Sequence, residues 1–135
     1  MSNWVSEKVD FYRGYKYVIY LNTRYGYRCG YVEIPEEHPE FQKPFMDIPI
    51  ESIQLTFSGK INGFNGWWIG FDHFHFYDGV DEEVIKQYNP TNYEELIEYA
   101  QSMKESPYLS FATTDKVERE CQTLIDEIID EYNMN

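Results

Sequence analysis

An aromatic stretch from Asn65 to Asp78, with the sequence NGWWIGFDHFHFYD, constrains the fold of this chain more than any other segment. It opens with a turn signal and continues with residue types that favour β-strands. Side chains alternate between the two faces of a strand. One face carries Trp67, Ile69, Phe71, His73, His75 and Tyr77, and the other carries Trp68, Gly70, Asp72, Phe74, Phe76 and Asp78. Both faces are aromatic, so we predict a central strand covered on both sides for most of its length.

Length and cysteine content set the broad class of the protein. At 135 residues and 16.2 kDa, residues 1–135 are expected to form a single domain that needs neither disulfides nor metal to fold. Cys29 and Cys121 are far apart and lack zinc-ligand spacing, so we expect reduced, structural thiols. The N-terminus lacks the apolar run of a signal peptide, and no stretch approaches the roughly 18 apolar residues of a membrane span. We therefore expect a soluble cytoplasmic protein with no membrane partner.

Charge is the second strong feature of the sequence. The formal net charge is -13, and it is concentrated toward the C-terminus, where residues 79–135 hold fourteen Asp and Glu against four Lys and Arg. Such a field repels phosphates, so direct binding of nucleic acid is not expected. It favours a partner with a basic surface. The alternative is that the charge only keeps a small protein in solution.

The first half of the chain predicts an antiparallel sheet. Tyr15–Leu21 and Tyr27–Ile34 are rich in Tyr and β-branched residues and are separated by a short connection, which predicts a β-hairpin. Residues 1–14 are expected to form only a lead-in, and four prolines make residues 35–49 a long loop. Ser52–Ser58 alternates as a third strand.

The second half predicts helices. Short helices over residues 81–88 and 93–103 precede a return strand at 106–112, and the last helix follows Thr114. Its apolar stripe comprises Val117, Cys121, Leu124, Ile125, Ile128, Ile129 and Tyr132. Its opposite face carries the acids that we expect to face solvent and to bind a partner, Glu120, Glu127, Asp130 and Glu131. We predict an α+β fold, an antiparallel sheet of four or five strands with C-terminal amphipathic helices packed on one face.

Histidines on one face of the aromatic strand suggest a metal site as one alternative. His73 and His75 are two residues apart, and Asp72 or Asp78 could add an oxygen ligand. The third histidine, His38, lies in the predicted loop and could fold over the end of the strand. The competing interpretation places the histidines in an aromatic wall, bonded to backbone or carboxylate groups. We favour it and expect no metal and no cofactor.

Acid–base or nucleophilic catalysis has weaker support. Asp72 lies among aromatic residues whose packing would desolvate a general acid or base, but an ordinary buried aspartate paired with Arg24, Arg28 or a backbone amide is favoured. GxSxG and Walker motifs are lacking, and neither cysteine has a catalytic context. We lean against an enzyme and assign no catalytic residue.

Thirteen Tyr, nine Phe and three Trp are more rings than a core needs, so some are expected to be anchors or stacking platforms. One candidate wall consists of Trp67, Trp68 and Phe74, with Arg24 and Arg28 of the basic hairpin as partners for an anionic, nucleotide-like ligand. The alternative is a hairpin whose outer face is covered by Tyr. The full candidate ligand-binding set is Trp67, Trp68, Asp72, His73, His75, Asp78, Arg24 and Arg28.

Four segments together resemble a family of small phage and prophage proteins with a WWxGFDxxHxxD-type motif. They are GYRCGYVEIPEEHPEF (26–41), LTFSGKINGF (55–64), WWIGFDHFHFYD (67–78) and VERECQTLIDEI (117–128). The matching motif positions are Cys29, Gly30, His38, Pro39, Thr56, Trp67, Trp68, Gly70, Phe71, Asp72, His75 and Asp78. The resemblance implies a phage accessory protein in a bacterial cytoplasm and no settled molecular function.

The chain departs from this family at three places. Relatives have His-Gly-Gly, Cys-Ala and small residues where this chain has Ser52-Ile53-Gln54, His73-Phe74 and Phe76-Tyr77. A polar pocket in the relatives would here lose a histidine and be filled with rings. Binding survives such a change more easily than catalysis does.

The leading hypothesis is a non-enzymatic, phage-encoded inhibitor that binds a basic host protein, such as a nuclease or another defence component, through its acidic surface. Two alternatives stay open. One is a module that sequesters a small anionic or nucleotide-like ligand, and the other is a residual metal-dependent enzyme that uses Asp72, His75 and Asp78. A homodimer is also kept among the expected assemblies.

Overall fold

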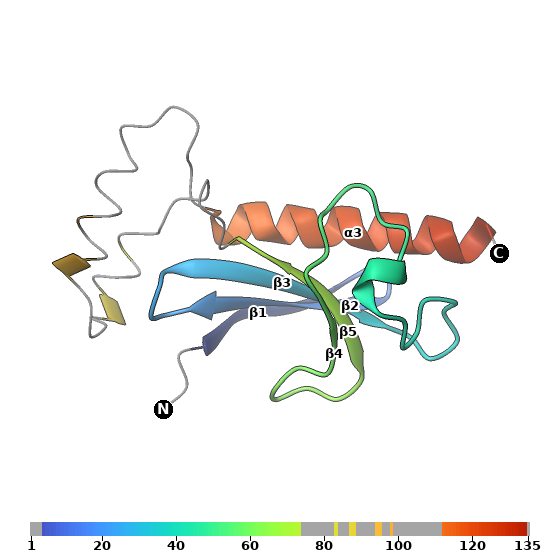
Figure 1. The fold of residues 1–135 in the computed structure, drawn as a ribbon, viewed down its shortest axis with the longest axis horizontal. Helices are drawn as coiled ribbons and strands as arrows, with labels where there is room; N and C mark the ends of the chain where they lie inside the picture. The colour runs from blue at the N-terminus through green and yellow to red at the C-terminus, as the bar shows by residue number, and fades with distance from the viewer. Residues whose placement is uncertain are drawn as a thin grey trace.

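A computed structural model describes residues 4–73 and 112–134, together with the single positions 83, 87, 88, 94, 95 and 98. In these ranges the chain forms one antiparallel sheet of five strands, and one long C-terminal helix packs on one face of it (Figure 1). The predicted α+β class is confirmed. In the described part of the chain, one long helix packs on the sheet, where the sequence predicted several helices.

The strands are β1 (Trp4–Tyr12), β2 (Tyr15–Asn22), β3 (Tyr27–Ile34), β4 (Phe57–Gly59) and β5 (Trp67–Asp72), and the helix is α3 (Thr114–Met134). A single 3-10 turn, η1 (Phe45–Asp47), interrupts the segment between β3 and β4. The strand order is β1-β2-β3-β5-β4, and all neighbours are antiparallel. No helix among the described residues is long and apolar enough to cross a membrane.

The β2–β3 hairpin is confirmed, with Tyr17 opposite Val32. The expectation that residues 1–14 form only a lead-in is wrong, because β1 pairs with β2 along its length. A register shift between Ser6 and Lys8 places a bulge at Glu7. The bulge breaks the alternation of this edge strand, which is why the sequence pattern hid it.

The aromatic strand is interior but not central. β5 lies between β3 and β4, and β3 is the middle strand of the sheet. Residues 68–71 of β5 are buried, which confirms that both of its faces are covered. The predicted strand at 52–58 is shorter than expected, because only Phe57–Gly59 pairs in register with β5. The expected helices at 81–88 and 93–103 and the strand at 106–112 lie largely outside the described residues; the described positions within the two helices are helical.

α3 closes one face of the sheet with the predicted apolar stripe. Val117, Cys121, Leu124, Ile125 and Ile128 are fully buried against alternate residues of β2, β3 and β5. Each large side chain buried in this way stabilises the fold by about 1.5–3 kcal/mol. The other end of the stripe is looser, since Tyr132 stays 43% exposed.

The helix begins one residue earlier than the sequence suggested. The carbonyl of Thr113 accepts from the Val117 amide at 3.0 Å, and its hydroxyl accepts from the Lys116 amide at 3.2 Å. Thr113 is therefore the capping residue, and Thr114 is already helical.

Gly30 sets the distance between α3 and the sheet. A Cβ added at this position would lie 2.5 Å from Cζ of Phe71 and 2.7 Å from Sγ of Cys121. Both atoms belong to buried side chains, so neither can move aside easily. The glycine in the middle strand lets the helix approach the sheet this closely.

We therefore expect Gly30→Ala to destabilise the protein by about 1–3 kcal/mol through overpacking, measured by equilibrium urea unfolding. Combined with Cys121→Ala, the loss should be smaller than the sum of the two single losses, because the smaller side chain yields space. A cost below about 0.5 kcal/mol for Gly30→Ala, the level typical of surface changes, would contradict this account of the packing.

Candidate ligand-binding pocket

The sheet face turned away from α3, here called the open face, carries many aromatic side chains. Residues opposite each other in an antiparallel pair share a face. Val18 pairs with Tyr31, and Gly70 is flanked by Tyr31 on β3 and Phe57 on β4. The neighbouring positions Tyr17, Val32 and Ile69 belong to the core under α3, so the first set points the other way.

A hollow of about 490 Å³ opens on this face, and we call it the aromatic pocket. It is lined by Trp4, Ser6, Tyr20, Tyr31, Phe57, Lys60, Ile61, Asn62 and Gly63. These residues come from β1, β2, β3, β4 and the connection that follows β4. Parts of the chain that are distant in sequence therefore meet there, because the sheet order places β1, β2 and β3 beside the β4–β5 pair.

The rings of the pocket form a row in edge-to-face contact. Ring centroids are 6.4 Å apart for Trp4 and Tyr20, 5.8 Å for Tyr20 and Tyr31, and 5.5 Å for Tyr31 and Phe57, with interplanar angles of 86°, 78° and 88°. Edge-to-face contact is the favoured geometry for aromatic pairs. Each ring is thereby held by its neighbours, so the wall is ordered before any ligand arrives.

Gly70 provides the space for this row. A Cβ at Gly70 would lie 2.4 Å from the Tyr31 ring and 2.8 Å from the carbonyl oxygen of Gly30. The Tyr31 ring fills the place that this side chain would take, and the Phe57 ring packs against Tyr31. A glycine inside a buried strand often marks such a close approach.

The polar groups of the pocket are neutral or positive. Lys60 is exposed, and the Tyr20 hydroxyl donates to the Asn62 carbonyl at 2.6 Å, which holds the loop against β2. Burial raises the pKa of Tyr20 and, more strongly, that of Tyr31, so both hydroxyls stay protonated and neutral at physiological pH. Among the described residues that line the pocket there is no carboxylate.

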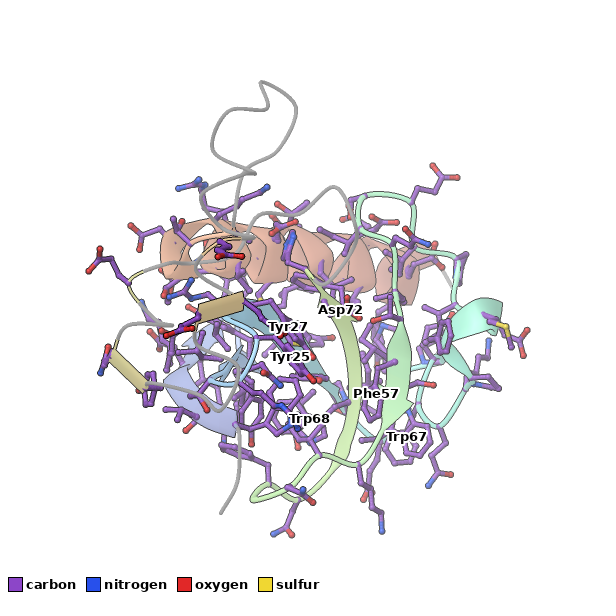
Figure 2. All side chains as sticks on the ribbon, turned by 60° about the vertical axis from the view of Figure 1, so that its left-hand side comes forward. Tyr25, Tyr27, Phe57, Trp67, Trp68 and Asp72 are labelled. Carbon is purple, nitrogen blue, oxygen red and sulfur yellow. The ribbon has the colours of Figure 1, made fainter. Side chains whose placement is uncertain are left out.

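Trp67 and Trp68 do not form the predicted aromatic wall, because their side chains lie on opposite faces of β5. Trp68 is fully buried on the open face, where it packs on Phe64 and its indole N–H donates to the Asn65 carbonyl at 3.0 Å. Trp67 packs against the core under α3, and Figure 2 shows the two side chains pointing away from each other. Phe74 lies outside the described residues. The pocket uses other rings.

Arg28 is a structural residue, contrary to the expectation that it pairs with a ligand. It is 6% exposed. Its Nε and Nη2 atoms donate to the two carboxylate oxygens of Glu7 at 2.7 and 3.2 Å, and Nη1 donates to the Ala112 carbonyl at 3.1 Å. Thr114 adds a bond to Glu7 at 3.1 Å. The pair joins the β1 bulge, β3 and the start of α3.

Arg24 differs from Arg28. It is exposed, and its guanidinium lies 5.2 Å from the ring centroid of Tyr25. Neither arginine lines the aromatic pocket. The expected arginine clamp is therefore not formed by this pair.

We predict that Arg28→Met lowers the free energy of unfolding by on the order of 3 kcal/mol, because it leaves the Glu7 carboxylate partly buried without its partner. Arg24→Met is the matched control and should change it by less than about 0.5 kcal/mol. Urea unfolding of both variants makes the comparison. Equal, small effects would show that Arg28 is not a structural tie.

Asp72 and His73 are each bound to groups of the protein. The Thr56 hydroxyl donates to Asp72 Oδ2 at 3.0 Å, so a hydroxyl of the segment before β4 is one partner of this carboxylate. His73 Nε2 lies 2.7 Å from Glu120 Oε1 of α3. The other two predicted members of this group, His75 and Asp78, lie outside the described residues.

His38 is held by α3, which overturns its proposed meeting with His73. Its Nε2 lies 2.9 Å from the Ile128 carbonyl, and its Nδ1 accepts from the Glu40 amide at 3.0 Å. His73 contacts Glu120, eight residues earlier on the helix, which is about 12 Å along its axis. The two histidines cannot share one metal ion. The described residues contain no cluster of three or more metal-ligating side chains.

Two of the four acids expected to face a partner are used inside the molecule. Glu120 pairs with His73, and the Glu127 carboxylate accepts from the backbone amides of Glu51 and Ser52 at 2.6 and 3.0 Å. The expectation of free, solvent-directed carboxylates is wrong for these two. Asp130 is exposed as expected.

Both thiols are buried and free. Burial raises the pKa of Cys29 to about 12 and also raises that of Cys121. Only the thiolate is a nucleophile, so neither sulfur can act as one at neutral pH. This agrees with the sequence-based expectation of structural thiols.

A thiol reagent such as dithionitrobenzoate should therefore label no cysteine in the native protein at neutral pH and both cysteines after unfolding in guanidinium. The readout is absorbance of the released chromophore. Rapid labelling of either cysteine in the native state would contradict the burial described for it.

Sequence reasoning missed most of the pocket residues. Trp4 and Ser6 were not predicted as site residues because they belong to β1, which the sequence pattern did not reveal. Lys60 and Asn62 lie in a connection that carries no motif. Tyr31 was noted only as part of a Tyr-rich hairpin. The usable signal was the pair of glycines, Gly70 and Gly30, within strands that are otherwise bulky.

Comparison of the chain with models of protein families, with curated proteins and with solved structures found no match.

Proposed function

We propose that this chain acts by binding, as an acidic protein that occupies the basic surface of a partner protein and inhibits it. The observation that supports this most is how the cations are used. Among the nine Lys and Arg in the described ranges, four are paired with carboxylates of the chain itself, namely Lys8–Glu118, Arg13–Asp126, Arg28–Glu7 and Lys43–Glu40. Each of these pairs cancels one acid and one cation, so the net charge of -13 is carried by the remaining carboxylates.

The acid-rich surface gathers at the C-terminal end of α3, and we call it the acidic end. It consists of Glu37, Asp130, Glu131 and Tyr132, and the Arg13–Asp126 ion pair borders it. The hydrogen bond to Asp126 raises the pKa of Arg13, and the nearby Asp130 raises it further. Burial raises the pKa of Tyr15, with a further contribution from the nearby Glu37 and Tyr132. Glu37 and residues 126–132 therefore lie close together beside the β1–β2 turn.

This surface combines two features of protein interfaces. Carboxylates steer a basic partner over distance and suppress wrong ones. A partly exposed tyrosine, Tyr132, packs against the buried ring of His38, with the ring centroids 5.4 Å apart and the planes tilted by 44°, and such supported rings are frequent hot spots. Asp130 and Glu131 remain in the proposed binding surface, whereas Glu120 and Glu127 do not belong to it, because they are bonded inside the molecule.

The biological setting of the proposal comes from the sequence resemblance to small phage and prophage proteins. It favours the cytoplasm of a bacterial host and a host defence component, such as a nuclease whose basic groove normally holds nucleic acid. An acidic protein can fill such a groove. A homodimer and a residual enzyme using Asp72, His75 and Asp78 stay predictions that no contact of the described residues tests.

The test captures partners from a bacterial lysate on immobilised protein at low salt, and identifies and quantifies them by mass spectrometry. We expect a basic protein whose capture falls as ionic strength rises. Glu37→Gln combined with Asp130→Asn should weaken its binding about five- to tenfold, since each rim charge contributes a fraction of a kcal/mol to about one.

The control removes the same charge elsewhere, with Asp47→Asn and Glu51→Gln, which are also exposed. It should retain most of the binding. Capture of no basic protein at low salt, or equal losses in the two double variants, would contradict the proposal that the acidic end carries recognition.

A further inference from the structure

The charge of the residues that line the aromatic pocket is opposite in sign to the net charge of the chain. The chain carries a net charge of -13, yet the described residues lining the pocket include Lys60 and no carboxylate. An anion that the rest of the surface repels therefore meets a cation here. Screening by salt limits the repulsion from distant charges to within about 10 Å, so the local sign decides what the pocket can hold.

The size and walls of the pocket suit a flat ring. Its volume of about 490 Å³ lies within the roughly 300–1,000 Å³ typical of small-molecule sites. The row of Trp4, Tyr20, Tyr31 and Phe57 presents ring edges and faces at successive near-right angles. Such platforms stack on heterocyclic bases with little preference for sequence or base type.

The rim supplies hydrogen-bonding groups on a fixed frame. Ser6 and Asn62 line the pocket, and both residue types carry side-chain hydrogen-bonding groups. The bond from the Tyr20 hydroxyl to the Asn62 carbonyl holds the loop that also carries Lys60. A rim ordered in advance lowers the entropic cost of binding.

We propose that the aromatic pocket binds an aromatic heterocycle that carries an anionic group, of the nucleoside monophosphate class. The heterocycle stacks on the rings of Trp4 and its neighbours, and the anionic group lies at Lys60. A quaternary ammonium ligand would also suit the rings, but Lys60 repels it and no carboxylate among the described lining residues pairs with it.

This inference does not rest on the proposed partner protein. The pocket is on the open face. Most of the acidic end belongs to α3, which covers the opposite side of the sheet (Figure 1). The test below uses the purified full chain and no other protein, so its outcome and that of the capture experiment are separable.

The experiment is calorimetric titration of the full chain with adenosine, guanosine, cytidine and uridine monophosphates, and with adenosine, inorganic phosphate and choline. We expect at least one monophosphate to bind, and its nucleoside and phosphate alone to bind at least tenfold more weakly. Lys60→Ala should weaken the monophosphate about five- to tenfold and leave the nucleoside unchanged. Lys116→Ala, which removes the same charge from α3, should change neither.

Trp4→Ala is the second variant, and its melting curve verifies that it folds. It should weaken the monophosphate and the nucleoside alike, because it removes a stacking ring and no charge. The inference is overturned if no monophosphate binds at millimolar concentration, if Lys60→Ala and Lys116→Ala have equal effects, or if choline binds more tightly than the monophosphates.

Discussion

The close packing of α3 on Gly30 is the contact on which the rest of the structure depends. A helix can approach a strand this closely only where a side chain is missing. At Gly30 the ring of Phe71 and the sulfur of Cys121 fill that space. The stripe from Val117 to Ile128 is thereby buried along its length. Glu118, bonded to Lys8 and to the Tyr17 hydroxyl, then ties the helix to β1 and β2.

α3 covers only one face, and on the other face the described side chains pack on one another. Edge-to-face rings and the connection between β4 and β5 do this around Gly70, and they leave the aromatic pocket open. The two faces of the sheet therefore have different roles. One face provides stability through aliphatic burial, and the other presents rings, hydroxyls and lysines at the surface.

The elements that local pattern alone determines could be predicted from the sequence. The β2–β3 hairpin and the apolar stripe of α3 follow from period-two and period-3.6 patterns, and so does the burial of β5 on both faces. β1 could not be predicted, because the bulge at Glu7 exchanges its two faces midway. The role of Arg28 was also hidden, since Glu7 and Ala112 are 21 and 84 residues away in sequence.

The candidate site was harder to predict than the fold, because it depends on the strand order. Trp67 and Trp68 are adjacent in sequence but lie on opposite faces, whereas Trp4, Tyr31 and Lys60 are distant in sequence and line one hollow. The positions of the titratable residues could not be predicted from the sequence for the same reason. His38 and His73 bond to α3 at positions 128 and 120, and only the packed helix shows that they are apart.

The central claim is that paired glycines let α3 close one face of the sheet while rings gather over the other. Nuclear Overhauser spectroscopy of the labelled protein tests it directly. We expect cross-peaks between the Gly30 α-protons and the Cys121 β-protons, and between the Gly70 α-protons and the ring of Tyr31. A spectrum in which these protons are assigned and either cross-peak is missing would contradict the account.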